Sequence, residues 1–468
     1  MDAINYLALA GAIVTFVLLL VAPRWGMPAL VAISPLLQVA TPRAGPGLNA
    51  ETALYTAALF SLAMRARPAL PPPAFLAPYL AFLAVMLLAA LIAATSLPIP
   101  GSLGVRLWEI ALPLKSELWP TLGLFLFFGL APDEQQRRRL LFAMTIAVLV
   151  AAVSSFIWPA GRADFVSPQR LTGFLYQNPN ALGSFLAIFS VIPLSAIFRQ
   201  KTSPALRIFS LMVYVAAVTA VVLTQSRGAW IAYVVGHLVW LFYVNRRLFV
   251  PAVIVIALMV ASILAAGLTP RAISERVEQT LKPGSSLFRA SDLTGGLDSS
   301  AQVRVVILRV AGDMWLDSPV WGHGFRSFYP LSAEYGHRYG LLRGRHRNWT
   351  GGVSAHSLYA RTTAEYGLIG LAVLGWFAWV LIGTGRSLVA GKGPERDLGV
   401  TFLAVLAGTG AMCLTMEALR SHQTSIPFWA LSGLAIRALY DEAVRRNATA
   451  KPGAAPGSRN AAPLRPNA

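Results

Sequence analysis

Apolar runs long enough to cross a lipid bilayer recur along almost the whole chain of 468 residues. A transmembrane helix needs about 20 consecutive apolar residues, and only helices and closed barrels satisfy every backbone polar group in lipid. Charged residues make up 13% of the sequence, about half the fraction of an ordinary soluble domain. The sequence therefore predicts an all-α fold, a polytopic transmembrane helical bundle of about 12–13 spans. The runs lie near residues 4–22, 27–40, 51–64, 75–95, 117–131, 139–158, 181–198, 205–223, 229–244, 248–268, 358–383, 398–419 and 426–440.

The first two runs differ from the others. Residues 4–22 follow no basic region and precede further spans, so they are interpreted as a retained helix rather than a signal peptide. Residues 27–40 are short for a crossing and contain Pro28 and Pro35, so this segment is expected to be kinked or partly interfacial. Whether it spans decides on which side the N-terminus lies, and the sequence leaves that open.

The basic residues indicate how the chain is oriented. The formal net charge is +19, from 39 basic and 20 acidic residues. In a soluble protein this excess would suggest nucleic acid, but here it follows in part from the enrichment of Lys and Arg in cytoplasmic loops, and no nucleic-acid partner is expected. Basic residues fall on alternate turns, which places the long segment 269–356 outside and the C-terminus inside. They are Arg24, Arg65, Arg67, Arg137–Arg139, Arg199, Lys201, Arg207, Arg246, Arg247, Arg386, Lys392, Arg396, Arg445, Arg446 and Lys451.

Four regions follow from this orientation. Residues 1–268 are expected to form an N-terminal transmembrane bundle, 269–356 one large external loop, and 357–441 the C-terminal transmembrane helices. Residues 442–468, rich in Ala, Pro, Asn and Arg, are expected to be a disordered cytoplasmic tail. Residues 96–116 are expected to be a further external loop.

The large loop is expected to contain an amphipathic helix, because apolar residues recur in it at helical spacing. Such a helix would lie on the membrane or cap the bundle. The residues that define its apolar face are Val303, Val306, Ile307, Val310 and Met314.

Arginines in the external loops are notable, because short external loops normally carry few basic residues. An arginine side chain can match two phosphate oxygens at once, so several converging arginines could hold a pyrophosphate at the membrane surface. The alternative is contact with lipid headgroups and solvation of the loops. A functional role is favoured for Arg227, which lies at a helix end before Gly228, a residue that permits close backbone approach. The other candidates are Arg304 and Arg309 on the expected loop helix, and Arg345 and Arg347 in the acid-free segment 337–347.

The run Asn178-Pro179-Asn180 precedes a helix expected to begin near Ala181. Asn180 is interpreted as its N-cap. A helix N-terminus also attracts anions, so capping and ligand binding are compatible roles for Asn178 and Asn180.

The run from Trp315 to Phe328 indicates a helix stop followed by a tight turn. Pro319 ends the helix, and Gly322 and Gly324 flank His323 in the turn. The Gly-x-Gly pattern alone is a weak phosphate signal and is interpreted here as turn geometry. A ligand role for His323 is the alternative.

His356 stands where the long loop meets a strongly apolar helix. A histidine with a pKa near 6.5 can accept a proton from a sugar hydroxyl at neutral pH. The alternative is that it simply caps the helix, and position alone does not decide between the two.

Two polar residues lie in the apolar run 398–419. Cys413 is the chain's one cysteine, which excludes an internal disulfide and a CxxC-type metal site. Glu417 is an acid near the outer end of the run, and acids in membrane segments are costly and usually functional. A structural pair with Arg420, one turn away, is the alternative.

Four motifs in order resemble the bacterial O-antigen ligases and the wider O-antigen ligase and polymerase superfamily. The most specific is His356-Ser357, nine further residues, and then Gly367-x-x-Gly370. The others are Gln177-Asn178-Pro179-Asn180 with Gly183, Ser226-Arg227-Gly228-Ala229, and Arg304 fifteen residues before Pro319 in a Pro-x-x-Gly-x-Gly run. Each is weak alone, but together they flank one large loop and cover roughly residues 150–440.

The resemblance implies a membrane-embedded glycosyltransferase of the GT-C type that needs neither a metal nor a cofactor. Such enzymes transfer a glycan from undecaprenyl pyrophosphate to an acceptor hydroxyl, with inversion, at the periplasmic face of the inner membrane. In the ligases the acceptor is a lipid A–core sugar. By this resemblance His356 is the base, and Arg227 and Arg304 hold the pyrophosphate and stabilise the leaving charge. The expected substrate-binding residues are Asn178, Asn180, Arg309, Arg345, Arg347 and Glu417.

Three alternatives stay open. An O-antigen or exopolysaccharide polymerase, or a protein O-oligosaccharyltransferase, would belong to the same superfamily. A transporter of bicarbonate or of a lipid-linked sugar is the alternative from another class. Transporters place charges and broken helices at mid-membrane, whereas the candidate residues here gather near the outer ends of the spans.

Overall fold

The computed structural model describes twelve stretches of the chain. They are residues 2–37, 49–64, 70–97, 102–131, 133–157, 171–172, 175–176, 178–199, 202–251, 253–254, 299–338 and 352–449. Within them the regular structure is helical and no strand occurs, which confirms the all-α prediction. Several residues and segments discussed above lie outside the described residues: Arg65 with Arg67, Gln177, Lys201, most of the expected span 248–268, residues 269–298 of the expected loop, Arg345 with Arg347, and the tail from residue 450 onward.

The described residues form the following helices in chain order. They are α1 (Asp2–Val21), α2 (Pro23–Ala32), η1 (Ser34–Leu36), α3 (Ala50–Ala63), α4 (Pro73–Ser96), α5 (Leu103–Leu118), η2 (Trp119–Leu122), α6 (Gly123–Leu130), α7 (Glu134–Ile157), α8 (Pro179–Phe189), α9 (Val191–Phe198), α10 (Pro204–Leu223), α11 (Arg227–Val244), α14 (Ser299–Asp317), α15 (Phe328–Arg338), α16 (Leu358–Ala390), α17 (Pro394–Cys413), η4 (Ala418–Arg420) and α18 (His422–Thr449).

Seven helical segments in the described part of the chain are long and apolar enough to cross a membrane, and the chain is a multi-pass membrane protein. A shorter apolar helix covers Tyr6–Val21. The segment with Pro28 and Pro35 forms the ten-residue α2 and then η1, so it is too short to cross as one straight helix. The seven segments are α4, α7, Pro179–Phe198 (α8 with α9), α10, α11, α16 and α17.

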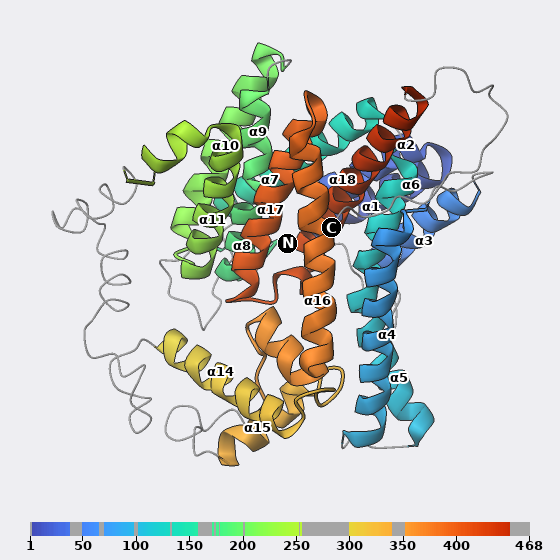
Figure 1. Ribbon diagram of the computed structural model, residues 1–468, viewed down its shortest axis with the longest axis vertical. Coiled ribbons are helices and arrows are strands. Elements are labelled where there is room, and N and C mark those ends of the chain that lie inside the picture. Colours follow the sequence, from blue (N-terminus) through green and yellow to red (C-terminus); the bar gives the residue numbers. More distant parts are fainter. Residues whose placement is uncertain are drawn as a thin grey trace.

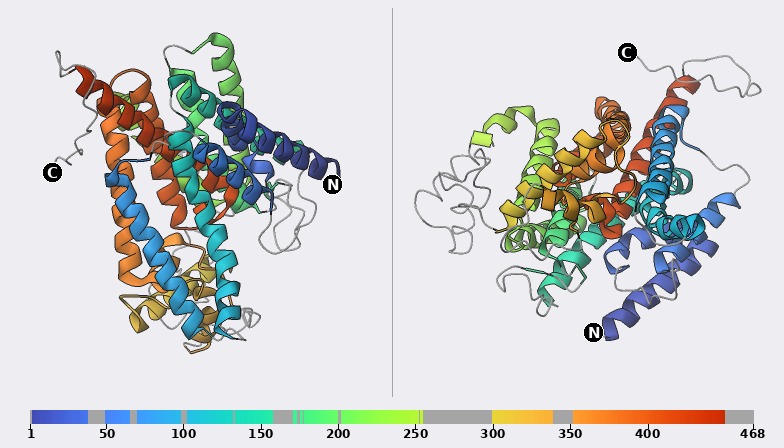
Figure 2. Two further views of the ribbon diagram at one scale, coloured as in Figure 1. Left: turned by 90° about the vertical axis from the view of Figure 1, so that its right-hand side faces the viewer. Right: turned by 90° about the horizontal axis from the view of Figure 1, so that it is seen from below.

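The long helix α16 contacts most of the elements that carry the sequence motifs. It packs against α17 and against α4. The loop helices α14 and α15 lie across the end of α16 that begins at Leu358 (Figure 1). We call this the loop end of the bundle. The pair α4 and α5 runs beside α16 and reaches the level of α15 (Figures 1 and 2).

Two expected segments were wrong. Residues 96–116 were expected to be an external loop, but Leu103–Leu118 form α5, whose Ile110 and Leu114 are buried beside α4. Its spaced apolar residues make an amphipathic helix, which the charges between them obscure in a hydropathy reading. Residues 117–131 were expected to span the membrane. They instead form the end of α5, then η2 and the eight-residue α6.

The amphipathic loop helix was predicted correctly and caps the bundle. In α14 the side chains of Val306, Ile307, Val310 and Met314 are buried, in one cluster with residues of α16. Leu308 and Arg309, which lie between Ile307 and Val310, are exposed. The helix therefore presents one face to α16 and the other away from the bundle.

A break in α16 at Gly367 anchors the turn that follows α14. Gly367 has φ +60°, outside the helical region. The backbone N–H groups of Leu368 and Ile369 donate to the carbonyls of Pro319 and Val320, at 2.9 and 3.3 Å. In the turn, the backbone N–H groups of His323 and Gly324 donate to the α16 carbonyls of Ala364 and Glu365, at 3.0 and 2.9 Å. The turn thus replaces hydrogen bonds that the helix loses at its break.

Glycine is required at this junction because a larger residue would clash with the neighbouring backbone. A Cβ on Gly367 would lie 2.4 Å from the Val320 carbonyl oxygen, and one on Gly322 would lie 2.4 Å from the Glu365 carbonyl carbon. Both residues, and Gly324, have positive φ. The expected tight turn is confirmed, and the glycines allow two backbone segments to touch.

Candidate functional site

The motif around Arg227 packs against the motif around Gly183. Ser226 is the N-cap of α11 and accepts from the backbone N–H of Ala229 at 3.4 Å. A Cβ on Gly183 would lie 2.9 Å from Ala229 Cβ and 2.9 Å from Thr224 Oγ1. Gly183 therefore lets α8 approach the first turn of α11, and this contact fixes the helix end that carries Arg227.

The expected cap of α8 was wrong by two residues. The helix begins at Pro179, and the N-cap is Asn178, whose side chain accepts from the backbone N–H of Asn180 at 2.8 Å. Proline is favoured at the first helical position because its missing N–H is not needed there. The structure thus gives Asn178 a capping role at the start of α8.

His356 immediately precedes α16 in an unusual backbone conformation. Its φ is +47°, which is uncommon for a residue other than glycine. The cap of α16 is Ser357, which accepts from the backbone N–H of Ala360 at 3.3 Å. The hydroxyl of Ser357 also contacts the Cys413 carbonyl oxygen, at 3.3 Å. The capping interpretation of His356 is therefore wrong, and its imidazole is left for another role.

Arg304 and Glu417 are the charged neighbours that influence His356. Partial desolvation and the positive charge of Arg304 lower the pKa of His356, while the negative charge of Glu417 opposes the shift. A lowered pKa keeps the imidazole neutral near pH 7, the state in which it can accept a proton. Arg304 of α14 and Glu417 of the segment after α17 thus lie near enough to His356 to influence its charge.

Arg309 lies apart from this group. Five residues after Arg304, it falls on the exposed face of α14, with its Nε 4.0 Å from Asp313 Oδ2 and 48% of its side chain exposed. Five residues turn an α-helix by about 140° beyond a full turn. The expected substrate role of Arg309 therefore has no support from its position.

Arg227 and His356 flank the same turn at the end of α17. Gly228 is packed so closely that a Cβ there would lie 2.1 Å from Thr415 Oγ1. On the other side Ser357 contacts Cys413 and the Tyr359 hydroxyl donates to the Gly410 carbonyl oxygen at 3.1 Å. Both motifs are thus fixed against the last turns of α17, at the loop end of the bundle.

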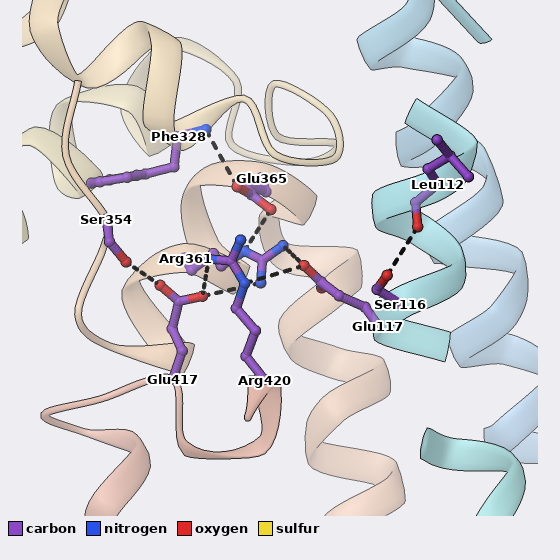
Figure 3. Close-up of polar contacts among 9 residues, drawn as sticks. All are labelled: Leu112, Ser116, Glu117, Phe328, Ser354, Arg361, Glu365, Glu417 and Arg420. Atoms are coloured by element: carbon purple, nitrogen blue, oxygen red, sulfur yellow. Dashed lines mark hydrogen bonds and ion pairs between the residues drawn. The ribbon is translucent and has the colours of Figure 1, made fainter. Parts of the chain in front are cut away.

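Glu417 lies in the connection between α17 and α18, and not inside a span as expected, because α17 ends at Cys413. It accepts a 2.7 Å hydrogen bond from the Ser354 hydroxyl and pairs with Arg361 Nη1 at 3.1 Å (Figure 3). Arg420 Nη1 is 3.3 Å away, so the expected one-turn pair exists as part of a larger cluster. Burial would raise the pKa of Glu417, but the charges of Arg361 and Arg420 lower it.

Arg361 is the centre of a buried ion cluster that the sequence reasoning missed. Its guanidinium contacts Glu365 Oε2 at 2.9 Å and Glu117 Oε1 at 2.8 Å, besides Glu417 (Figure 3). Only 6% of its side chain is exposed. Glu365 in turn accepts from the backbone N–H of Phe328 at 3.3 Å. One arginine therefore ties α5, α15, α16 and the α17–α18 connection together beside the His356 segment.

A sequence signal for part of this cluster was available. Arg361 and Glu365 are spaced i,i+4 in the first turns of an apolar helix, where an arginine needs a partner. Glu117, 244 positions away from Arg361, could not be found in this way.

His323 is held by protein groups. Its Nε2 lies 2.8 Å from the Met314 carbonyl oxygen and 3.5 Å from the Tyr335 hydroxyl. Its backbone N–H donates to the Ala364 carbonyl at 3.0 Å. These contacts support its place in the turn rather than a role as a ligand.

Part of the sequence matches a known protein family. Residues 212–375 match the O-antigen ligase family. The similarity to this family therefore covers the stretch from α10 to the middle of α16. The match includes Arg227, Arg304 and His356, while Asn178 and Glu417 lie outside it. This match and the apolar helices are consistent with a membrane protein of the glycosyltransferase type, associated with polysaccharide biosynthesis.

The chain was also compared with solved structures and with curated protein sequences. A solved chain from a peptidoglycan synthase complex that coordinates polymerization and crosslinking aligns with a TM-score of 0.44 and 17% identity, over 78% of this chain and 97% of that one. This similarity is too low to assign a shared fold. No curated protein sequence is significantly similar to this chain.

Proposed function

We propose that this protein is an O-antigen ligase-like glycosyltransferase of the bacterial inner membrane, working at the periplasmic face. It transfers a glycan from undecaprenyl pyrophosphate to a hydroxyl of a lipid A–core sugar, with inversion. The observation that carries the proposal is that His356, with Arg304 and Glu417 near enough to shift its pKa, lies at the end of the bundle where Arg227 is also fixed against α17.

His356 acts as the base. An imidazole nitrogen takes the proton of the acceptor hydroxyl, and the hydroxyl oxygen forms a bond to the anomeric carbon of the donor glycan. The bond from that carbon to the phosphate oxygen breaks, and undecaprenyl pyrophosphate leaves with the electron pair. Attack in line with the breaking bond inverts the configuration. The lowered pKa of His356 suits this role, because the residue is neutral at physiological pH.

Arg227 and Arg304 hold the diphosphate. Fixed guanidinium groups bind phosphate oxygens bidentately and stabilise the charge that develops on the leaving group. Arg304 faces the bundle from α14, and Arg227 is fixed by Gly228 against the end of α17. The charge of Arg304 also lowers the pKa of His356.

The test is a reconstituted transfer reaction. Purified protein in liposomes receives a glycan linked to undecaprenyl pyrophosphate, together with lipid A–core. Glycan attached to lipid A–core is the expected product. Longer chains that remain linked to the lipid carrier would instead assign polymerase activity, and uptake of the donor without any transfer would assign transport. Either result would overturn the proposed ligation.

A further inference from the structure

A second charged contact, outside the contacts of Arg361, joins the starts of α18 and α3. His422 is the first residue of α18, and Glu51 lies in the first turn of α3. Nδ1 of His422 is 3.0 Å from Oε1 of Glu51. The side chain of Glu51 is 6% exposed and that of His422 is 35% exposed. We call these two residues the His422–Glu51 pair. Neither belongs to the sequence motifs or to the proposed reaction.

The buried carboxylate of Glu51 depends on His422 for a compensating charge. Among the described residues, neither of the two facing atoms makes a well-aligned hydrogen bond. Their attraction is therefore that of an ion pair, which requires a proton on both imidazole nitrogens. Lys115 of α5 instead donates from Nζ to the Thr52 hydroxyl at 2.7 Å. A buried carboxylate without a compensating charge is costly, so the protonation state of His422 decides whether this contact stabilises the fold.

The two helix starts treat their charges differently. Asn49 caps α3 and accepts from the backbone N–H of Thr52 at 2.9 Å. Glu51 therefore lies at a helix N-terminus, where a negative charge is favoured. His422 also lies at a helix N-terminus, where a positive charge is disfavoured. The proton of His422 is thus stabilised by Glu51 and not by its own helix.

The pKa of His422, which lies before the apolar run 426–440, reflects the same contact. Burial lowers the pKa of His422, but the contact with Glu51 and its negative charge raise it above the ordinary value. The charge of Lys115 lowers this pKa, and that of Glu117 raises it. Geometry and charge therefore both favour the protonated imidazole in the folded protein.

The charged and titratable groups around the pair come from four parts of the chain. The short elements η1, η2 and α6, which also pack against α18, carry no titratable side chain. Glu117 and Glu417 are paired with Arg361, so Glu51 is the acid that pairs with His422. The groups are Glu51 and Tyr55 of α3, Lys115 and Glu117 of α5, Arg361 of α16, and Glu417 and Arg420 of the α17–α18 connection.

We propose that the His422–Glu51 pair is a proton-operated latch, which holds the start of α18 against α3 while His422 is protonated and releases it on deprotonation. Histidine is suited to such a switch because it titrates near neutral pH. Since the pKa is raised, the stability from the pair is fully present below about pH 6.5, the ordinary histidine value. It is lost as the pH rises through the pKa of His422 in the folded protein.

The latch borders the support of the His356 segment. Arg420, two residues before His422, lies 3.7 Å from Glu117 and 3.3 Å from Glu417 (Figure 3). Glu417 in turn accepts from the Ser354 hydroxyl. Release of the start of α18 therefore loosens the connection that carries Glu417. The latch itself is a property of the fold and does not depend on the proposed reaction.

Histidine titration by NMR measures the latch directly. The full chain in detergent carries isotope-labelled histidine, and the signal of His422 is the one missing from His422→Gln. Its midpoint is expected above about pH 6.5. Glu51→Gln is expected to move the midpoint to lower pH, and Lys115→Gln to higher pH, because these variants remove a negative and a positive charge. A wild-type midpoint at or below the ordinary value, or one that Glu51→Gln does not move, would overturn the proposal.

Thermal unfolding shows whether the proton stabilises the fold. Melting temperatures are measured at about pH 6 and about pH 8.5. From the lower to the higher pH, the wild type is expected to lose roughly 1–3 °C more than Glu51→Gln. The single variant His422→Gln and the double variant are expected to behave like Glu51→Gln, because each lacks the same ion pair.

The control for these measurements is His323→Gln. His323 lies 2.8 Å from the Met314 carbonyl oxygen, away from the pair, and its replacement is expected to leave the difference between wild type and Glu51→Gln in place. The same pH dependence of melting in the wild type and in Glu51→Gln would overturn the latch. The Glu51→Gln comparison decides this even where a histidine variant does not fold.

Failure of the proposed function is distinguishable, because it appears as missing transfer in the reconstituted reaction. The titration and the melting temperatures need no substrate.

Discussion

The hydroxyl of Ser354, which lies two residues before His356, donates a 2.7 Å hydrogen bond to Glu417 Oε1. Glu417 is itself fixed by Arg361 at 3.1 Å. The segment that carries the proposed base is therefore held by an acid of another connection, which is anchored in a buried ion cluster. The position of His356 depends on residues far from it in sequence.

Breaking this link should reduce the rate without abolishing substrate binding. Ser354→Ala removes the hydrogen bond, and we expect kcat to fall roughly tenfold to a hundredfold, because small misplacements of a catalytic group are costly. Ser116→Ala is the control, since the Ser116 hydroxyl donates to the Leu112 carbonyl of its own helix (Figure 3). Steady-state kinetics on both variants check this. An equal kcat for the two would contradict the link.

The pH dependence of the transfer rate should change when the charged neighbours of His356 are replaced, because they shift its pKa. The rate is expected to fall on the acid side with an apparent pKa below 6.5, because partial desolvation and Arg304 lower the pKa of His356. Arg304→Gln removes a positive charge, so the pKa rises and the acid limb moves to higher pH. Glu417→Gln removes a negative charge, so the limb moves to lower pH. Arg309→Gln, on the opposite face of α14, is expected to leave it in place. Identical limbs in all variants would show that His356 does not titrate in this range.

The break in α16 should require glycine at position 367. Gly367→Ala places a Cβ 2.4 Å from the Val320 carbonyl oxygen at a φ of +60°, and we expect a loss of roughly 1–3 kcal/mol together with weaker docking of the turn. Gly383→Ala, in a helical stretch with open space around it, should be neutral or stabilising by about 0.5–1 kcal/mol. Melting temperatures in detergent distinguish them. A Gly367→Ala protein as stable as Gly383→Ala would mean that the contact with the turn does not constrain the helix.

Arg361 should be the most sensitive residue of the ion cluster. Arg361→Met leaves buried carboxylates without their partner, which costs roughly 3–5 kcal/mol. Adding Glu365→Gln removes one of these charges and is expected to recover part of the loss. The comparison uses thermal unfolding of the single and the double variant. A double variant less stable than the single one would contradict the assignment of the cost to unpaired carboxylates.

The sequence predicted what local patterns determine. The apolar runs led to the all-α membrane fold, the spacing of Val306, Ile307 and Val310 led to the capping helix, and Gly322 and Gly324 led to the turn. The motif glycines proved to be contact points between segments, at Gly183, Gly228 and Gly367. Steric requirements of this kind leave a trace in the sequence because only glycine satisfies them.

Features that depend on distant partners could not be predicted. Glu117 pairs with Arg361 across 244 positions, and the charges that make α5 look like a loop belong to that partnership in part. The two faces of α14 separate Arg304 from Arg309, although both looked equally suitable as anion ligands in sequence. The cap at Asn178 was within reach, since Pro179 marks the first helical position.

The most direct test of the account is transfer by the His356→Asn protein. Asparagine tolerates the left-handed backbone that His356 adopts and cannot act as the base, so the variant should fold and bind both lipids. The measurement is the rate at which the purified protein moves glycan from undecaprenyl pyrophosphate to lipid A–core. We predict a rate lower by about 10²–10⁴-fold at unchanged melting temperature. Transfer at the wild-type rate would contradict the role of His356 and with it the proposed mechanism.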